Sequence, residues 1–307
     1  PRERLYDYGH GRTPGVGGTT TLVYDTRRQR LVRQFLSLAG TYRNCAGGPT
    51  PWNSWLTCEE SVQRVGRGGE EDQYVAETNH GYVFEVPARS AVGIADPIPL
   101  TAMGRFNHEA VAIEPGSGVV YLTEDRDDGL LYRFIPKTQG RLRAGGTLQA
   151  LVIRDQPGLD TRNWDKVSVP VGEKLAVNWR NLDGIDSPED DLRLRGFKAG
   201  AARFARGEGI WYGNGEAYFA CTSGGRERTG QIWRYVPSPH EGRSGEQRQP
   251  ATLELFIEPN DAKLLKNADN LCVAPWGDLV LCEDRSEDVV RLVGVTPDGR
   301  LYTLAHN

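Results

Sequence analysis

The sequence is poor in the features that build disulfide frameworks, membrane spans or nucleic-acid surfaces. Its 307 residues include five cysteines, five histidines and a single methionine. An odd number of cysteines in a chain this long is not a disulfide framework. No run approaches the roughly 18 apolar residues that a membrane span needs. The net charge of −4, from 37 basic and 41 acidic side chains, gives no electrostatic reason to expect a nucleic-acid partner.

What the sequence does contain is a repeated module. The clearest copy, residues 107–136, has a polar and acidic start, a short apolar run, a turn, a second apolar run ending at Glu124-Asp125, and a third run ending at Pro136. The same order recurs at residues 207–237 and 269–297, and more loosely at residues 44–87.

The module predicts an all-β fold. Strands of about five residues between glycine, asparagine and proline turns indicate antiparallel sheets. Repeats of this size favour blades around an axis, so we expect a β-propeller as one domain over residues 1–307. A β-sandwich of similar hairpins is the alternative. A further strand is expected at residues 147–153, and residues 238–250 are expected to be an exposed loop.

Carboxylates recur at fixed places in the module. One set begins the first strand of a copy and consists of Glu109, Glu208 and Asp269. A second set ends the second strand and consists of Glu59, Glu124 and Glu283. A third set follows the second directly and consists of Glu60, Asp125 and Asp284. In a dry site these like charges need a compensating cation or protonation. Oxygen-rich clusters suit hard cations such as calcium or ferric iron. For any single pair, a solvated surface is the alternative.

Three further residues stand next to these carboxylates. Cys58 precedes Glu59, and a thiolate there would favour a redox-capable metal such as iron; a small buried hydrophobe is the alternative. His108 is a ligand, an acid or base, or a structural histidine. Arg206 would hold a phosphate or carboxylate of the substrate, or else pair with Glu208. A Cys45–Cys58 bridge is compatible with the spacing, and Cys272 and Cys282 are expected in the core.

Several segments resemble the PhoX alkaline phosphatase family. The most specific is the segment from Asn44 to Glu60, and the others are the segments from Gly104 to Glu109, from Tyr121 to Arg126 and from Ala205 to Gly209. The resemblance extends through Asp269-Asn270 and Glu283-Asp284 to the C-terminus. It implies a six-bladed propeller that holds iron and calcium ions and hydrolyses small-molecule phosphomonoesters. It also implies a periplasmic or secreted protein, although no signal segment is present here.

The resemblance also assigns roles to residues. Cys58 is similar to the iron-bridging thiolate, Glu109 and Glu208 to further iron ligands, and Arg206 to the arginine that binds the substrate phosphate. The calcium positions would be filled from Glu59, Glu60, Glu124, Asp125, Asp269, Glu283 and Asp284. Family members usually carry a further N-terminal stretch, so one blade is expected to be incomplete. We expect a monomer.

Two other classes of function stay open at this point. One is a calcium-dependent propeller hydrolase of lactones or phosphotriesters, which would need neither iron nor Cys58. The other is a non-catalytic binding propeller stabilised by calcium. The metal content of the protein separates all three.

Overall fold

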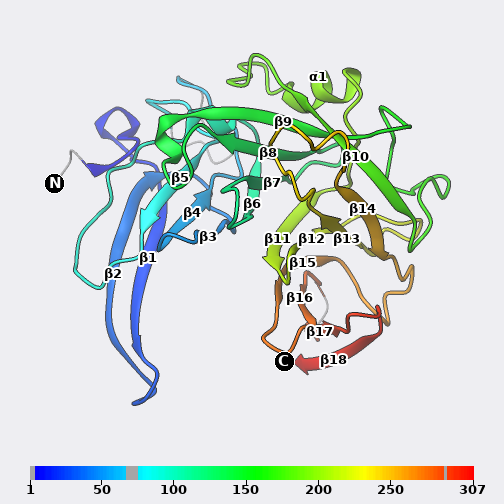
Figure 1. Cartoon of the computed structure of the whole chain (residues 1–307). Helices are drawn as coiled ribbons and strands as arrows, with labels where there is room; N and C mark the ends of the chain where they lie inside the picture. Colours follow the sequence, from blue (N-terminus) through cyan, green and yellow to red (C-terminus); the bar gives the residue numbers. More distant parts are fainter. Residues whose placement is uncertain (1–3, 67–74, 287–288) are drawn as a thin grey trace.

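The computed structural model describes residues 4–66, 75–286 and 289–307, and their regular structure is almost entirely β-strand (Figure 1). In chain order the strands are β1 (Gly17–Asp25), β2 (Arg30–Thr41), β3 (Gly48–Pro49), β4 (Ser54–Cys58), β5 (Val83–Pro87), β6 (His108–Ile113), β7 (Val120–Glu124), β8 (Leu131–Pro136), β9 (Gly146–Ile153), β10 (Lys174–Asn181), β11 (Gly207–Gly213), β12 (Glu216–Cys221), β13 (Gln231–Val236), β14 (Thr252–Ile257), β15 (Ala268–Val273), β16 (Leu279–Glu283), β17 (Arg291–Val295) and β18 (Leu301–His306). A short α-helix, α1 (Leu192–Lys198), lies between β10 and β11.

The strands form antiparallel meanders that follow the repeated module. The unit β6–β9 and the unit β11–β14 each have four sequential strands, and β10 joins them by pairing with β9 and with β14. The strands β15–β18 form a third four-stranded unit, and β3–β5 form a three-stranded one. The first strand β11 contacts both β6 and β15, which places the start of each unit near a common centre. The four expected copies of the module are therefore confirmed.

The inner strands are buried on both faces because neighbouring units pack against each other. All six residues of β6 and all five of β7 are buried. Aromatic side chains fill the space between units: the ring of Phe204 lies 5.4 Å from that of Phe219 and 5.6 Å from that of Trp233, both edge-to-face. Short apolar runs bounded by turns are typical of strands with this double burial.

The hairpin β1–β2 extends away from the other strands (Figure 1). It is the only two-stranded sheet that the described residues form.

None of the helices in the described ranges has the length and apolarity needed to cross a membrane. The number of six blades stays a prediction.

Two sequence expectations about the connections need correction. Residues 137–200 were expected to add one strand, β9, which is present, but they also form β10 and α1. The segment 238–250 was expected to be exposed, yet Ser238 and Glu241 are buried within it. Glu241 is buried because its carboxylate accepts a hydrogen bond from Arg133 at 2.7 Å and another from the Tyr235 hydroxyl at 2.8 Å.

Candidate metal centre

Three carboxylates converge where the first strands of three units meet. Glu109 lies on β6, Glu208 on β11 and Asp269 on β15, and one carboxylate oxygen of each lies within 4.8 Å of the others. The sequence placed these three residues at equivalent positions of the module, and the structure brings them together.

The close approach of β11 to β15 depends on a residue without a side chain. A Cβ atom at Gly209 would lie 2.6 Å from the Cα of Asn270, which is closer than real Cβ contacts come. Any side chain at this position would push β11 away from β15. Because Glu208 and Asp269 flank these two positions, the glycine sets the distance between their carboxylates.

A second group joins a thiol to the same centre. One ligand atom each from Cys45, Glu60 and Glu109 lies within 4.8 Å of the others, so Glu109 belongs to both groups. The backbone explains how Cys45 comes there: the N–H of Gly47 donates to the carbonyl of Glu109 at 3.1 Å. Gly47 has a φ of +99°, and a Cβ there would lie 1.9 Å from the carbonyl oxygen of Leu56. A glycine is therefore required for this segment to lie beside β6.

The electrostatics of the cluster favour a cation. Burial, assisted by the charges of Glu60 and Asp269, raises the pKa of Glu109 to about 8. Burial and the Glu109 charge raise the pKa of Glu208 to about 10, and burial raises that of the Cys45 thiol well above its usual range. Oε1 of Glu109 is buried without a hydrogen-bond partner among the described residues. Carboxylates and a thiol in this arrangement fit a bound metal ion, which would neutralise them and use the unpaired oxygen.

Cys58 lies outside both groups of the described residues, although its carbonyl accepts a hydrogen bond from the N–H of Cys45 at 2.8 Å; its metal ligation stays a prediction. It is fully buried in an apolar cluster with Leu56, Val83 and Val111, which corresponds to the alternative of a small buried hydrophobe. The Cys45–Cys58 bridge that the spacing left open is not formed, because both thiols are free. The expectation of two further core thiols is also wrong: Cys272 is half-buried and Cys282 is exposed.

Glu59 is engaged in a separate buried polar network. Its carboxylate accepts hydrogen bonds from the backbone N–H groups of Tyr42 at 2.9 Å and Gly81 at 2.8 Å. It also lies 2.6 Å from Nδ1 of His80, whose Nε2 is 3.0 Å from the carboxylate of Asp7. These contacts occupy both oxygens of Glu59 and favour a structural role over the predicted calcium ligation.

Glu124 and Glu283 are bound within their own units in the same way. Glu124 accepts hydrogen bonds from the hydroxyl of Tyr132 at 2.7 Å and the N–H of Leu130 at 3.2 Å. Glu283 forms an ion pair with Arg291 at 2.7 Å. Neither belongs to the groups that could hold a metal in the part of the chain described. Their calcium ligation stays a prediction, although Oε1 of Glu124 is buried and lacks a hydrogen bond within that part.

The third predicted set lies at the edge of the cluster. Glu60 belongs to the thiol-containing group and forms a 3.4 Å ion pair with Arg43. Asp125 binds Arg206. Asp284 is exposed. The pKa of Asp269 is raised, first by the burial of Asp269 and second by the charge of Asp284.

Arg206 is held at the cluster by two carboxylates. Its Nε and Nη2 donate to the two oxygens of Asp125 at 2.7 and 2.9 Å, and Nη2 also donates to Glu208 at 2.9 Å. The alternative of a pairing with Glu208 is therefore present, and the binding of a substrate phosphate by Arg206 stays a prediction. The backbone of Arg206 has a φ of 54°, in the left-handed region that non-glycine residues avoid. Such strain is often found at functional sites.

A polar cleft opens beside the cluster. Its volume is about 330 Å³, and Glu60, Asp125 and three arginines, Arg43, Arg126 and Arg206, contribute to its lining. Arg43 and Arg126 were not predicted from the sequence as site residues. Asp127 also lines the cleft, so three guanidinium groups face three carboxylates, and a ligand in the cleft would lie beside both.

His108, next to Glu109, is buried like a structural histidine, although its Nδ1 has no hydrogen-bond partner among the described residues. It is fully buried, its Nε2 donates to the carbonyl of Gly104 at 3.1 Å, and its ring stacks on Phe106 at 3.6 Å between centroids. Burial lowers its pKa to about 3, so the ring is neutral. We assign it no role in proton transfer.

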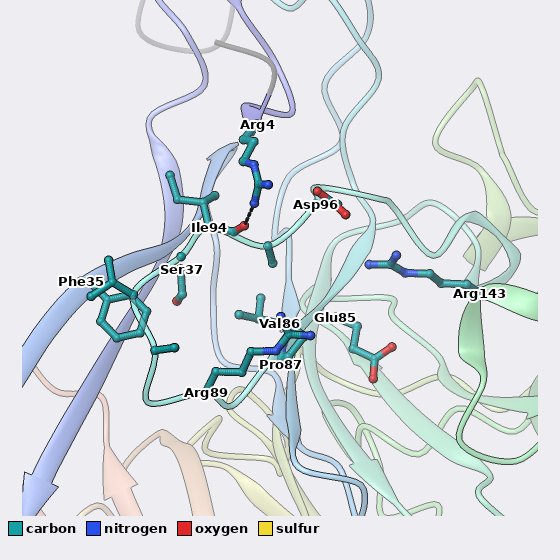
Figure 2. Close-up of a pocket in the computed structure, with 14 residues that line it drawn as sticks. Arg4, Phe35, Ser37, Glu85, Val86, Pro87, Arg89, Ile94, Asp96 and Arg143 are labelled. Atoms are coloured by element: carbon teal, nitrogen blue, oxygen red, sulfur yellow. Dashed lines mark hydrogen bonds between the residues drawn. The ribbon is translucent and has the colours of Figure 1, made fainter. Parts of the chain in front are cut away.

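A larger cavity of about 580 Å³ lies away from this centre, between the N-terminal segment, β2, β5 and the loop after β5 (Figure 2). Glu85 lines it and accepts hydrogen bonds from Trp52 and Ser54, both at 2.7 Å. None of the residues that could hold a metal lines it, so the smaller polar cleft is the one associated with the cluster.

Comparison with known proteins identifies the family. The family model for alkaline phosphatase PhoX matches residues 18–307. The chain belongs to the PhoX alkaline phosphatase family. No curated protein matches the chain in sequence. The PhoX of Pseudomonas fluorescens, solved in complex with vanadate, a transition state analogue, matches with a TM-score of 0.62 and 18% identity, covering 94% of this chain and 65% of that chain.

The match to PhoX confirms the β-propeller fold expected from the repeats. This chain spans 65% of the length of the Pseudomonas fluorescens protein. A solved glucose dehydrogenase also matches, with a TM-score of 0.40 and 14% identity over 96% of this chain and 76% of that chain.

Proposed function

We propose that this PhoX family member is a metal-dependent phosphatase that hydrolyses small-molecule phosphomonoesters. The observation that carries the proposal is the position of the carboxylate and thiol cluster at an arginine-lined cleft. Cations in the cluster and arginines beside it are the two kinds of positive charge that stabilise a transferring phosphoryl group. Membership of the family supports the same reaction.

We propose iron and calcium as the metals. The group of Cys45, Glu60 and Glu109 mixes sulfur with oxygen, a donor set that suits iron. The group of Glu109, Glu208 and Asp269 offers only oxygen, which suits calcium or another hard cation. When bound, such ions supply Lewis-acid charge that screens phosphoryl oxygens and acidifies water.

The protein's own residues bind and orient the ester. Asp125 fixes the guanidinium of Arg206 through two of its nitrogens, and Nη1 has no partner among the described residues. Nη1 is therefore available to donate to a phosphoryl oxygen. Arg126, whose Nη2 donates to Asn107 at 3.2 Å and forms an ion pair with Asp190 at 3.3 Å, contributes a second guanidinium to the cleft. The polar lining favours a small hydrophilic alcohol as the leaving group.

Hydrolysis of p-nitrophenyl phosphate at alkaline pH tests the proposal. We expect activity with iron and calcium supplied, and its loss after strong chelation. Glu208→Gln should lower kcat/KM by about a hundredfold or more because it removes a carboxylate from the cluster. Glu227→Gln, on an exposed Arg226–Glu227 pair, is the matched control and should leave activity unchanged. Activity that survives both chelation and Glu208→Gln would contradict a metal-dependent phosphatase.

Two further expectations accompany this function. We propose that the protein acts in the periplasm or outside the cell, as the family resemblance implies, and cell fractionation checks this. We also expect a monomer, which light scattering checks.

A further inference from the structure

A second polar cavity lies against the outer strands, away from the carboxylate cluster. Its volume is about 970 Å³, and it is lined by β8, β9, β10 and the loop 243–248. Of the cluster, Glu109, Glu208 and Asp269 lie on the first strands of their units, whereas β8 and β9 are the third and fourth strands of theirs. The lining includes one glutamate, Glu246, and five arginines: Arg133, Arg154, Arg180, Arg243 and Arg248. We call it the arginine cavity.

The single acidic residue in the lining is already paired with an arginine. Arg133 is buried and pairs with Glu246, its Nη2 donating at 2.8 Å, and it pairs also with the buried Glu241. Both nearby carboxylates, Glu246 in the lining and Glu241 behind it, are therefore paired with Arg133.

The other four arginines keep their charge. Within the described residues, none of them forms an ion pair, and Arg154 donates only to the backbone carbonyl of Gln247, at 2.6 Å. Arg180, Arg243 and Arg248 are exposed. In a chain of net charge −4, this is a local concentration of unneutralised positive charge. Guanidinium groups bind phosphate and carboxylate oxygens in bidentate fashion, so the cavity suits a ligand with more than one anionic group.

The wall between the arginines is rigid and partly apolar. Trp179 on β10 contributes the apolar part, because the neighbouring Val177 is buried, and Arg133 lies over the Trp179 ring at 4.5 Å from its centroid. The Trp179 ring is fixed because its N–H donates to the hydroxyl of Tyr235 at 3.1 Å. Beside it, Gln149 accepts a hydrogen bond from Nε of Arg133 at 2.7 Å. A preformed wall of this kind lowers the entropy lost on binding.

We propose that the arginine cavity binds a small organic polyphosphate that joins an aromatic ring to two or more phosphate groups, with the chemistry of a nucleoside diphosphate. The unpaired arginines would bind the phosphates, and the exposed part of Trp179 would contact the ring. The cavity is at the upper end of the roughly 300–1,000 Å³ found for small-molecule sites, which fits a ligand of this size. The inference does not rest on the proposed phosphatase activity.

Calorimetric titration of the full chain tests the proposal. The probe is α,β-methylene-ADP, which resists hydrolysis; adenosine and methylenediphosphonate represent its two halves. The variant Arg243→Glu/Arg248→Glu reverses two exposed charges of the cavity. The matched control, Arg27→Glu/Arg30→Glu, makes the same change on the exposed end of the β1–β2 hairpin. The variant Glu208→Gln shows whether the probe binds at the carboxylate cluster and not in the arginine cavity.

We expect α,β-methylene-ADP to bind the wild-type protein, Arg27→Glu/Arg30→Glu and Glu208→Gln with affinities within about twofold. Arg243→Glu/Arg248→Glu should weaken binding at least tenfold because two charge-assisted contacts are replaced by repulsion. Each half of the probe should bind at least about tenfold more weakly than the whole. Absence of binding at millimolar probe would overturn the proposal. So would binding that Glu208→Gln abolishes and Arg243→Glu/Arg248→Glu leaves intact, or methylenediphosphonate binding as tightly as the whole probe.

Discussion

The pH dependence of stability in the metal-free protein follows directly from the carboxylate cluster. In the folded chain the pKa of Glu109 is raised from 4.5 to about 8 and that of Glu208 from 4.5 to about 10. Between pH 5 and 8 the folded state therefore binds more protons than the unfolded state. The free energy of unfolding must fall as pH rises through this range.

The magnitude can be bounded from these shifts. One pKa unit corresponds to about 1.4 kcal/mol, and structural relaxation around a buried pair reduces the full effect. We expect the metal-free protein to lose roughly 3 kcal/mol of unfolding free energy between pH 5 and pH 8. Saturating metal should remove most of this loss, because a cation neutralises the same carboxylates.

Urea denaturation in the presence of a strong chelator measures the effect. The double variant Glu109→Gln/Glu208→Gln is the control. It keeps the other buried groups with raised pKa values, such as Glu124 at about 7. The difference in unfolding free energy between wild type and variant therefore reports the cluster alone. The double variant should be more stable than the wild type at pH 8 and nearly equal at pH 5. A wild-type stability that is flat or rises over this range, or a double variant with the same slope, would refute the reasoning.

Three further predictions concern single positions. Gly209→Ala should weaken metal binding at least tenfold, measured by competition with a chromogenic chelator, because the new Cβ separates β11 from β15; an unchanged affinity would contradict the argument. Arg206→Lys should lower kcat/KM by about 10²-fold or more, since lysine cannot hold both oxygens of Asp125 and still contact phosphate; full activity would exclude Arg206 from the site. Arg133→Ala should cost about 3–5 kcal/mol of unfolding free energy, because it leaves Glu241 buried without its cation; a change under about 1 kcal/mol would contradict this.

The repeated module made the blades and the central carboxylates predictable. Because each copy begins its first strand at an acidic residue, residues as distant in sequence as Glu109, Glu208 and Asp269 could be assigned one location. The strand β9 was predicted separately, at residues 147–153. The elements that the module lacks, β10 and α1, had no repeat to identify them and were missed.

The same module could not distinguish a ligand from a structural carboxylate. Glu59 and Glu60 are adjacent, yet Glu59 is bound by His80 and backbone N–H groups from residues about twenty positions away, while Glu60 reaches the cluster. Those partners depend on the tertiary arrangement. Cys45 was missed for a related reason: its place beside β6 follows from the backbone bond between Gly47 and Glu109. The paired glycines after Cys45 were the available signal, because they mark a close backbone approach.

The metal content of two cysteine variants tests the central claim most directly. The account predicts that purified Cys45→Ala loses at least one equivalent of bound metal by elemental analysis, because its sulfur lies in the group with Glu60 and Glu109. Cys58→Ala, altered in the apolar core, should retain the metal of the wild type. Loss of metal in Cys58→Ala with full occupancy in Cys45→Ala, or a metal-free wild type that is folded and active, would contradict it.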